Sequence, residues 1–235
     1  MYKFDVGNFN KRLSAIQERA DFKDFIANVD KTYIEDFKNT DWKQADAETF
    51  LKMYWPRRSE LGAIFSDEAF LFIDTLSEEK PKLTVEIGSM YGVSTRLLSA
   101  LAKRNDGKLI TIDAGMTPSV EINLKTLNLQ DTTTLIKDWT PWLTTRPDYE
   151  IDFLFIDGDH SLISIIVDYH YFNYFLKKGG LVAFHDMNMK ESQDAVKLII
   201  ERDRLEEVAR VGRLFIYRKI ANDHEKYFQV IKRKD

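Results

Sequence analysis

Short apolar runs alternate with segments of helical periodicity along the chain from residue 83 onward. The runs are rich in Val, Ile, Leu and Phe and show little apolar–polar alternation, which is typical of strands buried on both faces of a parallel sheet. The pattern predicts strands at Leu83–Ile87, Lys108–Asp113, Thr133–Ile136, Ile151–Ile156 and Leu181–His185. It predicts helices at Ser94–Lys103, Val120–Leu127, Ser161–Lys178 and Ser192–Arg202.

The end of the chain departs from this strand–helix order. Two further strand candidates, Glu207–Val211 and Arg213–Arg218, flank Gly212, and a glycine between two strands is typical of a hairpin. The predicted fold is therefore a doubly wound α/β domain of Rossmann-like type. Its seven-stranded sheet is mostly parallel and ends in a C-terminal antiparallel hairpin.

Residues 1–80 carry a different pattern, that of helices with polar faces. We expect these helices at Phe9–Ala27, Lys31–Phe37, Ala47–Tyr54 and Asp67–Leu76. No Pro-, Gly- or Ser-rich linker separates them from the sheet, so we predict a helical extension or lid on the substrate side at 1–80 and the main domain at 81–235. Two interpretations of residues 54–58 stay open, a turn between helices and the mouth of a substrate site.

Composition narrows the class of protein. Hydrophobic residues make up 44% of the 235 residues, which supports a packed core, and no apolar run reaches the length of a membrane span. The formal net charge of −4 and the lack of a basic face argue against a nucleic-acid partner. The absence of cysteine excludes disulfides and thiolate metal sites. Together with a start that lacks a signal-peptide pattern, this leads us to expect a cytoplasmic protein.

The loop after the first predicted strand, at residues 84–95, predicts a cofactor site. Two glycines, Gly88 and Gly92, lie within this loop, and a helix follows directly, so free backbone N–H groups converge there. Met90 stands where a dinucleotide loop requires glycine, which argues against a bound pyrophosphate. Glu86, at the end of the strand, favours a cationic ligand such as S-adenosylmethionine. An ordinary strand–helix turn explains the loop equally well when it is taken alone.

Two further strand ends carry candidate cofactor contacts. Asp113 ends the second strand, where a carboxylate can accept hydrogen bonds from ribose hydroxyls, although a lone aspartate there can also be a helix cap. Asp138 and Trp139 follow the third strand. Trp139 can stack on an adenine while Asp138 binds its amino group, and packing alone is the alternative.

Ionisable residues also follow the fourth and fifth strands. Asp157 and His160 end the run Phe-Leu-Phe-Ile-Asp-Gly-Asp-His, and His185 and Asp186 end the run Leu-Val-Ala-Phe-His-Asp. Neighbouring parallel strands end at one edge, so Asp157 and Asp186 are expected to lie close together with a cation between them. Carboxylates suit a hard divalent cation such as Mg²⁺, and an imidazole can accept a proton near neutral pH.

Residues 81–220 resemble the class I S-adenosylmethionine-dependent methyltransferases, and most closely the small metal-dependent O-methyltransferases of the catechol and macrolide-sugar types. The loop Val-Glu-Ile-Gly-Ser-Met-Tyr-Gly-Val-Ser at 85–94 carries the resemblance, together with the two acidic strand ends. The resemblance implies that Gly88, Tyr91 and Ser94 surround the methionine part of the cofactor. It also implies that Asp113 binds the ribose.

The same resemblance implies a metal-assisted reaction. Asp157, Asp186 and His185 would bind the metal, although His185 departs from the Glu-Asp and Asp-Asn pairs of the two enzyme types, and His160 would be the general base. The implied substrate is a small-molecule hydroxyl of a sugar, phenol or polyol, and a homodimer is left open. The alternatives are an NAD-type oxidoreductase on a similar sheet and a non-catalytic cofactor-binding protein.

Overall fold

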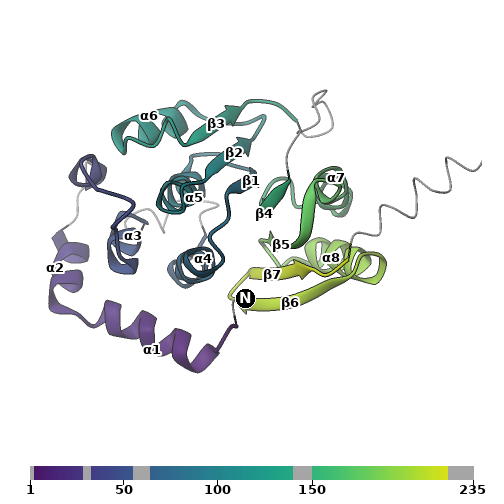
Figure 1. Ribbon diagram of the computed structural model, residues 1–235, viewed down its shortest axis with the longest axis horizontal. Coiled ribbons are helices and arrows are strands. Elements are labelled where there is room, and N and C mark those ends of the chain that lie inside the picture. The colour runs from purple at the N-terminus through teal and green to yellow at the C-terminus, as the bar shows by residue number, and fades with distance from the viewer. Residues whose placement is uncertain (1–2, 29–32, 55–63, 140–149, 222–235) are drawn as a thin grey trace, which may run out of the picture.

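The computed structural model describes residues 3–28, 33–54, 64–139 and 150–221. Its sheet has the strand order β3-β2-β1-β4-β5-β7-β6. The strands are β1 (Leu83–Ile87), β2 (Lys108–Ile112), β3 (Thr133–Ile136), β4 (Ile151–Ile156), β5 (Leu176–Phe184), β6 (Leu205–Val211) and β7 (Leu214–Lys219). The first five run parallel, whereas β7 is antiparallel to both β5 and β6 (Figure 1). The predicted fold class, including the C-terminal hairpin, is confirmed.

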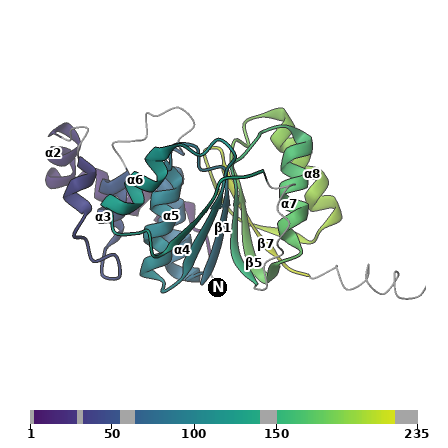
Figure 2. The ribbon, with the colours of Figure 1, turned by 90° about the horizontal axis from the view of Figure 1, so that it is seen from above.

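Helices cover both faces of the sheet, which Figure 2 shows edge-on between them. The helices before β1 are α1 (Val6–Gln17), α2 (Ala20–Asn28), the 3₁₀ helix η1 (Tyr33–Phe37), α3 (Ala47–Tyr54) and α4 (Ser66–Glu79). Those after it are α5 (Val93–Arg104), α6 (Pro118–Thr126), α7 (Leu162–Asn173) and α8 (Lys190–Arg202). In Figure 2, α7 and α8 lie on one side and α2 to α6 on the other, so the fold has three layers.

Alternation along β4 divides the core between these two faces. Phe153 and Phe155 belong to the apolar cluster under α3 to α6, whereas Leu154 and Ile156 belong to the cluster under α7 and α8. All four side chains are buried, as expected for a central parallel strand. Phe72 of α4 contacts both phenylalanine rings edge-on, at centroid distances of 5.6 and 4.9 Å. The N-terminal extension therefore shares one core with the sheet.

The largest differences from the helices expected from sequence occur at two places. The helix expected at Phe9–Ala27 is divided into α1 and α2, which end and begin around Glu18 and Arg19. The helix expected to run to Lys178 ends at Asn173, because β5 begins at Leu176. The glycine pair at 179–180, which the sequence pattern makes a helix stop, lies instead in an irregular stretch of β5. There Leu176 pairs with Ile151 and Leu181 pairs with Phe153, so the extra residues form a bulge.

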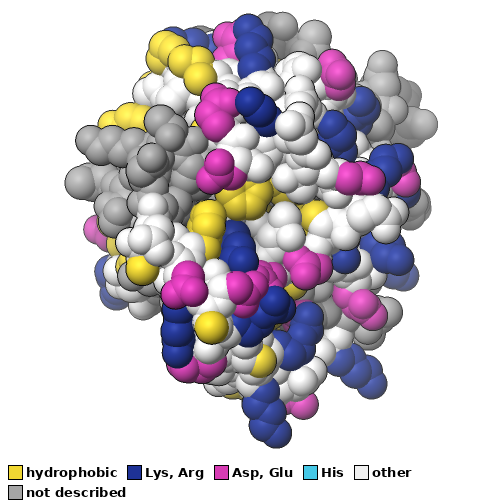
Figure 3. Space-filling model, turned by 90° about the vertical axis from the view of Figure 1, so that its left-hand side faces the viewer, with side chains coloured by type: hydrophobic (Ala, Val, Ile, Leu, Met, Phe, Trp, Pro, Cys, Tyr) yellow, Lys and Arg dark blue, Asp and Glu magenta, His cyan; other side chains and the backbone are white. Residues whose placement is uncertain are grey.

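The face of the molecule on the left of Figure 1 is shown in Figure 3. Lys and Arg side chains are interspersed there with Asp and Glu, and hydrophobic side chains lie between them in small groups. The described side chains of this face therefore form no surface of a single charge. Among the described residues, no helix is both long and apolar enough to span a membrane.

Candidate functional site

A cavity of about 640 Å³ opens where the parallel strands end at their carboxyl edge. Segments that follow five strands line it, which is where ligands bind in open α/β sheets. Of the residues predicted from sequence, those in the lining are Gly88, Tyr91, Ser94, Asp113, Asp138, Trp139, Asp157, His160 and Asp186. Glu86 and His185 were also predicted and are not in the lining. None of the described residues of the extension lines the cavity, and residues 55–58 lie outside the described chain.

Gly88 is required by the packing of two strand ends. Its φ is +92°, and a Cβ at this position would lie 2.1 Å from the carbonyl oxygen of Asp157. Gly92 caps α5 with φ +79° and lies against Val120 of α6. Gly88 thus lets the end of β1 approach the end of β4 closely. This approach fixes the position of Asp157 relative to the loop after β1.

Glu86 does not face the cavity, in contrast to the sequence-based expectation. Its side chain is fully buried, and its two carboxylate oxygens accept hydrogen bonds from Ser94 Oγ at 2.6 Å and Thr95 Oγ1 at 2.7 Å. Both hydroxyls are in the first turn of α5, so Glu86 ties β1 to the helix. Burial raises the pKa of Glu86 to about 7. Side chains of adjacent strand residues point to opposite faces of the sheet. The place of Glu86 near the end of β1 therefore does not by itself direct its side chain to the cavity.

Asp113 lies in the cavity wall, but its carboxylate is engaged with the protein backbone. Its Oδ2 accepts hydrogen bonds from the N–H groups of Ser89 at 2.8 Å and Met90 at 2.6 Å, and its Oδ1 from that of Gly115 at 2.6 Å. Met90 has φ +42°, a conformation that this bond helps to hold. Asp113 therefore shapes the loop after β1.

Aromatic side chains form an exposed rim to the cavity. Tyr91 is 42% exposed and Trp139 60% exposed, and both line the opening. Asp138 accepts a hydrogen bond from the Trp139 N–H, which orients the start of the segment after β3. From α7, Ile163 and Val167 add two further exposed apolar side chains. An apolar rim suits a flat or ring-shaped ligand.

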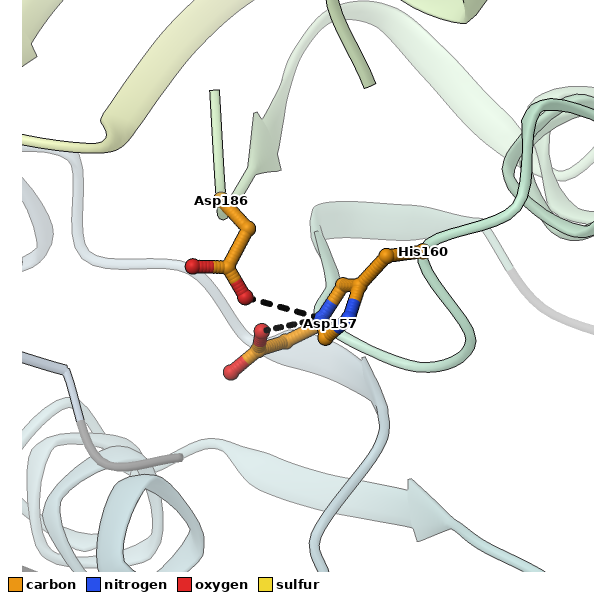
Figure 4. A group of neighbouring side chains, drawn as sticks. All are labelled: Asp157, His160 and Asp186. Carbon is orange, nitrogen blue, oxygen red and sulfur yellow. Dashed lines mark ion pairs between the residues drawn. The ribbon is translucent and has the colours of Figure 1, made fainter. Parts of the chain in front are cut away.

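Three ionisable side chains converge within this cavity. Asp157 follows β4, His160 precedes α7 and Asp186 follows β5, and Figure 4 shows their side chains pointing toward one another. His160 Nε2 lies 2.8 Å from Asp186 Oδ2 and 3.8 Å from Asp157 Oδ1. The imidazole is not aligned for a hydrogen bond to either oxygen, so these are ion-pair contacts. One donor atom from each residue lies within 4.8 Å of the others, as in a metal site.

The opposite charges within this group shift the pKa values of His160 and Asp186. Contacts with Asp157 and then with Asp186 raise the pKa of His160 to about 9. Burial opposes ionisation of Asp186, but His160 and His185 lower the pKa of its carboxyl well below the usual range. At neutral pH His160 is thus an imidazolium between two carboxylates.

The structure gives His185 a different place from the predicted metal site. Its ring is almost fully buried, with Nδ1 2.9 Å from Asp157 Oδ1 and Nε2 3.1 Å from Glu68 Oε2. Although burial opposes protonation, Asp157 above all, and then Asp186 and Glu68, raise the pKa of His185 to about 11. Both ring nitrogens are engaged as donors, so His185 has no lone pair for a metal and lies behind Asp157.

Two residues of this group were missed by the sequence-based reasoning. Arg213, beside the hairpin glycine, places Nη1 2.7 Å from Asp186 Oδ1. Glu68 lies in α4, 117 residues before His185 in the chain. Arg213 lies in a turn and Glu68 in the first turn of a helix. Both are ordinary places for surface charges, so no local pattern could have found them.

The segments that line the cavity belong to a stretch of the chain that matches a known protein family. Residues 85–187 match the family model described as a methyltransferase domain. This part of the chain is similar to methyltransferase domains. The match begins in β1 and ends just after β5, so it includes the loop after β1, Asp157, His160 and Asp186, and excludes the extension and the hairpin. The predicted resemblance to the methyltransferases is confirmed.

One curated relative matches part of the chain. An uncharacterized protein, R132 of Acanthamoeba polyphaga mimivirus, is 34% identical over 120 residues, which cover 46% of this chain and 53% of that protein. The chain thus spans about half the length of the curated relative it matches.

Solved methyltransferase structures share the fold. The SAH-bound methyltransferase PaMTH1 of Podospora anserina superposes with a TM-score of 0.62 at 12% identity, over 94% of this chain and 99% of that one. The O-methyltransferase TomG of Streptomyces achromogenes, solved with SAM, gives a TM-score of 0.58 at 14% identity, over 76% and 91%. A Bacillus cereus O-methyltransferase, solved with SAH, gives 0.55 at 16% identity, over 84% and 100%. At these identities the similarity establishes the fold.

Proposed function

We propose that the methyltransferase domain transfers a methyl group from S-adenosylmethionine to a hydroxyl of a small molecule, with the help of a divalent cation. One observation carries the proposal. The loop after β1 and the group formed by Asp157, His160 and Asp186 line a single cavity. A cofactor held by the loop and an acceptor held by the acidic group would therefore meet inside it.

The described lining suits S-adenosylmethionine in charge and shape. It contains six aspartates and neither Lys nor Arg, which favours a ligand with a sulfonium and an ammonium group. The N-terminus of α5 lies beside the loop, and the rim offers Tyr91 and Trp139 to an adenine ring. The same set disfavours the pyrophosphate of NAD, the alternative raised by the sequence.

The acidic group suits a divalent cation in its donor chemistry. Asp157 and Asp186 supply carboxylate oxygens, the donors that a hard divalent cation prefers. His185 and Arg213 contact the carboxylates from behind, as the groups that orient metal ligands often do. When bound, such a cation would lower the pKa of an acceptor hydroxyl and offset the charge of the two carboxylates.

The roles of the chain's own groups follow from this geometry. His160 lines the cavity beside Asp186 and can accept the acceptor's proton only after it has lost its own, because the pKa of His160 is raised to about 9. The two aspartates orient the acceptor oxygen toward the methyl donor, and this positioning supplies much of the rate. The loop holds the donor in line with that oxygen.

Radiolabelled S-adenosylmethionine tests the proposal against a panel of sugars, phenols and polyols. We expect acceptor-dependent product that is lost in excess chelator and in His160→Ala. His170→Ala serves as the control, because His170 is exposed on α7. Undiminished turnover in chelator would remove the cation from the proposal. Tight binding of S-adenosylhomocysteine with no acceptor-dependent product would favour a non-catalytic cofactor-binding protein.

A further inference from the structure

Glu68 is a fully buried carboxylate near the start of α4. Its Oε2 accepts a hydrogen bond from the Phe65 N–H at 2.6 Å, which closes the first turn of the helix. Its Oε1 accepts another from the Arg213 N–H at 2.6 Å, in the turn between β6 and β7. His185 Nε2 lies 3.1 Å from Oε2. One side chain thus joins the extension, the end of β5 and the hairpin.

Two branches lead from Glu68 to the proposed site. In one, His185 bridges Glu68 and Asp157, with distances of 3.1 and 2.9 Å. In the other, Arg213 donates its backbone N–H to Glu68 and its Nη1–H to Asp186, the latter at 2.7 Å. Each of the two aspartates of the cavity therefore has a basic residue behind it that also contacts Glu68.

The packing around Glu68 leaves it little freedom. A Cβ on Gly212 would lie 2.7 Å from Glu68 Oε1, so the hairpin turn closes directly on the carboxylate. The Arg213 guanidinium also lies over the Phe65 ring, at 4.3 Å from the centroid. A buried ion network of this kind gives little stability compared with apolar residues of the same size, so stability alone does not account for it.

We propose that Glu68 is a positioning residue of the candidate site, which sets the carboxylate of Asp157 through His185 and that of Asp186 through Arg213. The inference rests on the function proposed above only for its catalytic consequence, because the geometric claim concerns this chain's own side chains. Glu68 does not line the cavity and touches no reacting group. It makes the extension part of the site, although the extension lies outside the family match.

The four histidines of the chain allow a direct test by NMR with ¹⁵N-labelled histidine. In the wild type we expect both ring N–H protons of His185 to be visible, since both nitrogens donate to carboxylates. In Glu68→Gln we expect the His185 Nε2 signal to move, and the ring signals of His160 to move with it as Asp157 and Asp186 reorient. His185→Gln assigns the spectrum.

Glu48→Gln is the matched control. Glu48 is also a buried carboxylate of the extension, paired with Lys52 and Arg19, but it contacts nothing at the site. It should leave the signals of His160 unchanged. Coincident His160 signals in folded Glu68→Gln and the wild type would overturn the inference. If Glu68→Gln does not fold, Arg213→Gln replaces it, because that variant keeps the backbone bond to Glu68 and cuts only the branch to Asp186. Unchanged His160 signals there would also overturn the inference.

Manganese titration then measures the consequence for the site. With Mn²⁺ as the probe, we expect binding to the wild type, detected by broadening of the His160 signals. Its affinity should be about 10- to 100-fold weaker in Glu68→Gln and unaltered in Glu48→Gln. A wild type that does not bind Mn²⁺ would count against the cation of the proposed function, whereas the histidine spectra would still decide the role of Glu68. Equal Mn²⁺ affinity in folded Glu68→Gln and the wild type would contradict that role.

Discussion

Acidic residues on the two sides of the cavity point in different directions. On the β1–β2 side, Glu86 and Asp113 turn their carboxylates to the protein's own hydroxyl and N–H groups. On the β4–β5 side, Asp157 and Asp186 face each other across His160. The first pair holds the loop and helix after β1, and the second pair converges on one imidazole inside the cavity. A carboxylate at a strand's end thus marks the edge of a site, but only its hydrogen-bond partners show whether it serves the ligand or the backbone.

The largest effect is expected from Asp157→Asn, which keeps the size of the side chain and removes its charge. Methyl transfer should fall more than about 100-fold, because a ligand of the proposed cation is lost. Binding of S-adenosylhomocysteine should change less than about threefold, because the loop after β1 is untouched. Calorimetry and a radiolabel assay measure the two quantities on one preparation.

Asp113→Asn, on the other side of the cavity, should affect cofactor binding more than turnover. Fewer acceptors would hold the N–H groups of Ser89 and Met90, so we expect weaker cofactor binding and largely retained turnover at saturating cofactor. Equal loss of turnover in both variants would show that the two sides do not differ in role.

Gly88→Ala should destabilise the fold by more than about 3 kcal/mol, because a Cβ there combines a strained φ with a clash against Asp157. Gly179→Ala is the control, since Gly179 has φ +85° but no atom within 4 Å of the position that a Cβ would take. That variant should lose only about 1 kcal/mol through strain. Thermal unfolding of both separates the clash from the strain, and equal losses would contradict the close approach of the two strand ends.

Glu86→Gln should stabilise the protein at pH 8 and not at pH 4. The carboxyl has a pKa of about 7 in the folded chain against 4.5 when exposed, so the folded state binds more protons between these values. Ionisation of the buried Glu86 carboxyl therefore costs no stability below pH 4.5. The cost grows up to pH 7 and reaches about 3 kcal/mol at most. Urea unfolding across this range measures it. A stability difference between variant and wild type that does not vary with pH would show that the pKa of Glu86 is not raised.

The smallest effect is expected from Trp139→Ala at the rim. Loss of an exposed ring that stacks on the cofactor should weaken S-adenosylhomocysteine binding about 3- to 10-fold. Because Trp139 is 60% exposed, thermal stability should not change. Ile122→Ala, on the equally exposed outer face of α6, should alter neither. Unaltered affinity in Trp139→Ala would remove this residue from the cofactor wall.

The fold could be predicted from the sequence because each of its signals is local. Apolar runs such as Phe153–Ile156 define the buried strands, and Gly212 defines the hairpin between β6 and β7. The end of α7 was predicted too late because the glycines at 179 and 180 fit a helix stop and a bulged strand equally well. Local patterns cannot separate those two cases, since the bulge depends on pairing with β4.

The candidate site could be predicted only in part, for a related reason. The position of Asp157 and Asp186 at neighbouring strand ends follows from parallel pairing alone. The direction of Glu86 depends on the hydroxyls of α5, and that of His185 on a glutamate far away in the chain. Glu68 and Arg213 come together only through tertiary packing, so no spacing in the sequence indicates them.

Calorimetric titration with S-adenosylhomocysteine, with NAD as the competing ligand, tests the central claim most directly. The claim is that the cavity beside Asp157, His160 and Asp186 is an S-adenosylmethionine site. We predict one molecule of S-adenosylhomocysteine bound per chain, weakened in Asp113→Asn and unaffected by NAD. Binding of NAD in its place, or no binding of S-adenosylhomocysteine to the folded protein, would contradict the account.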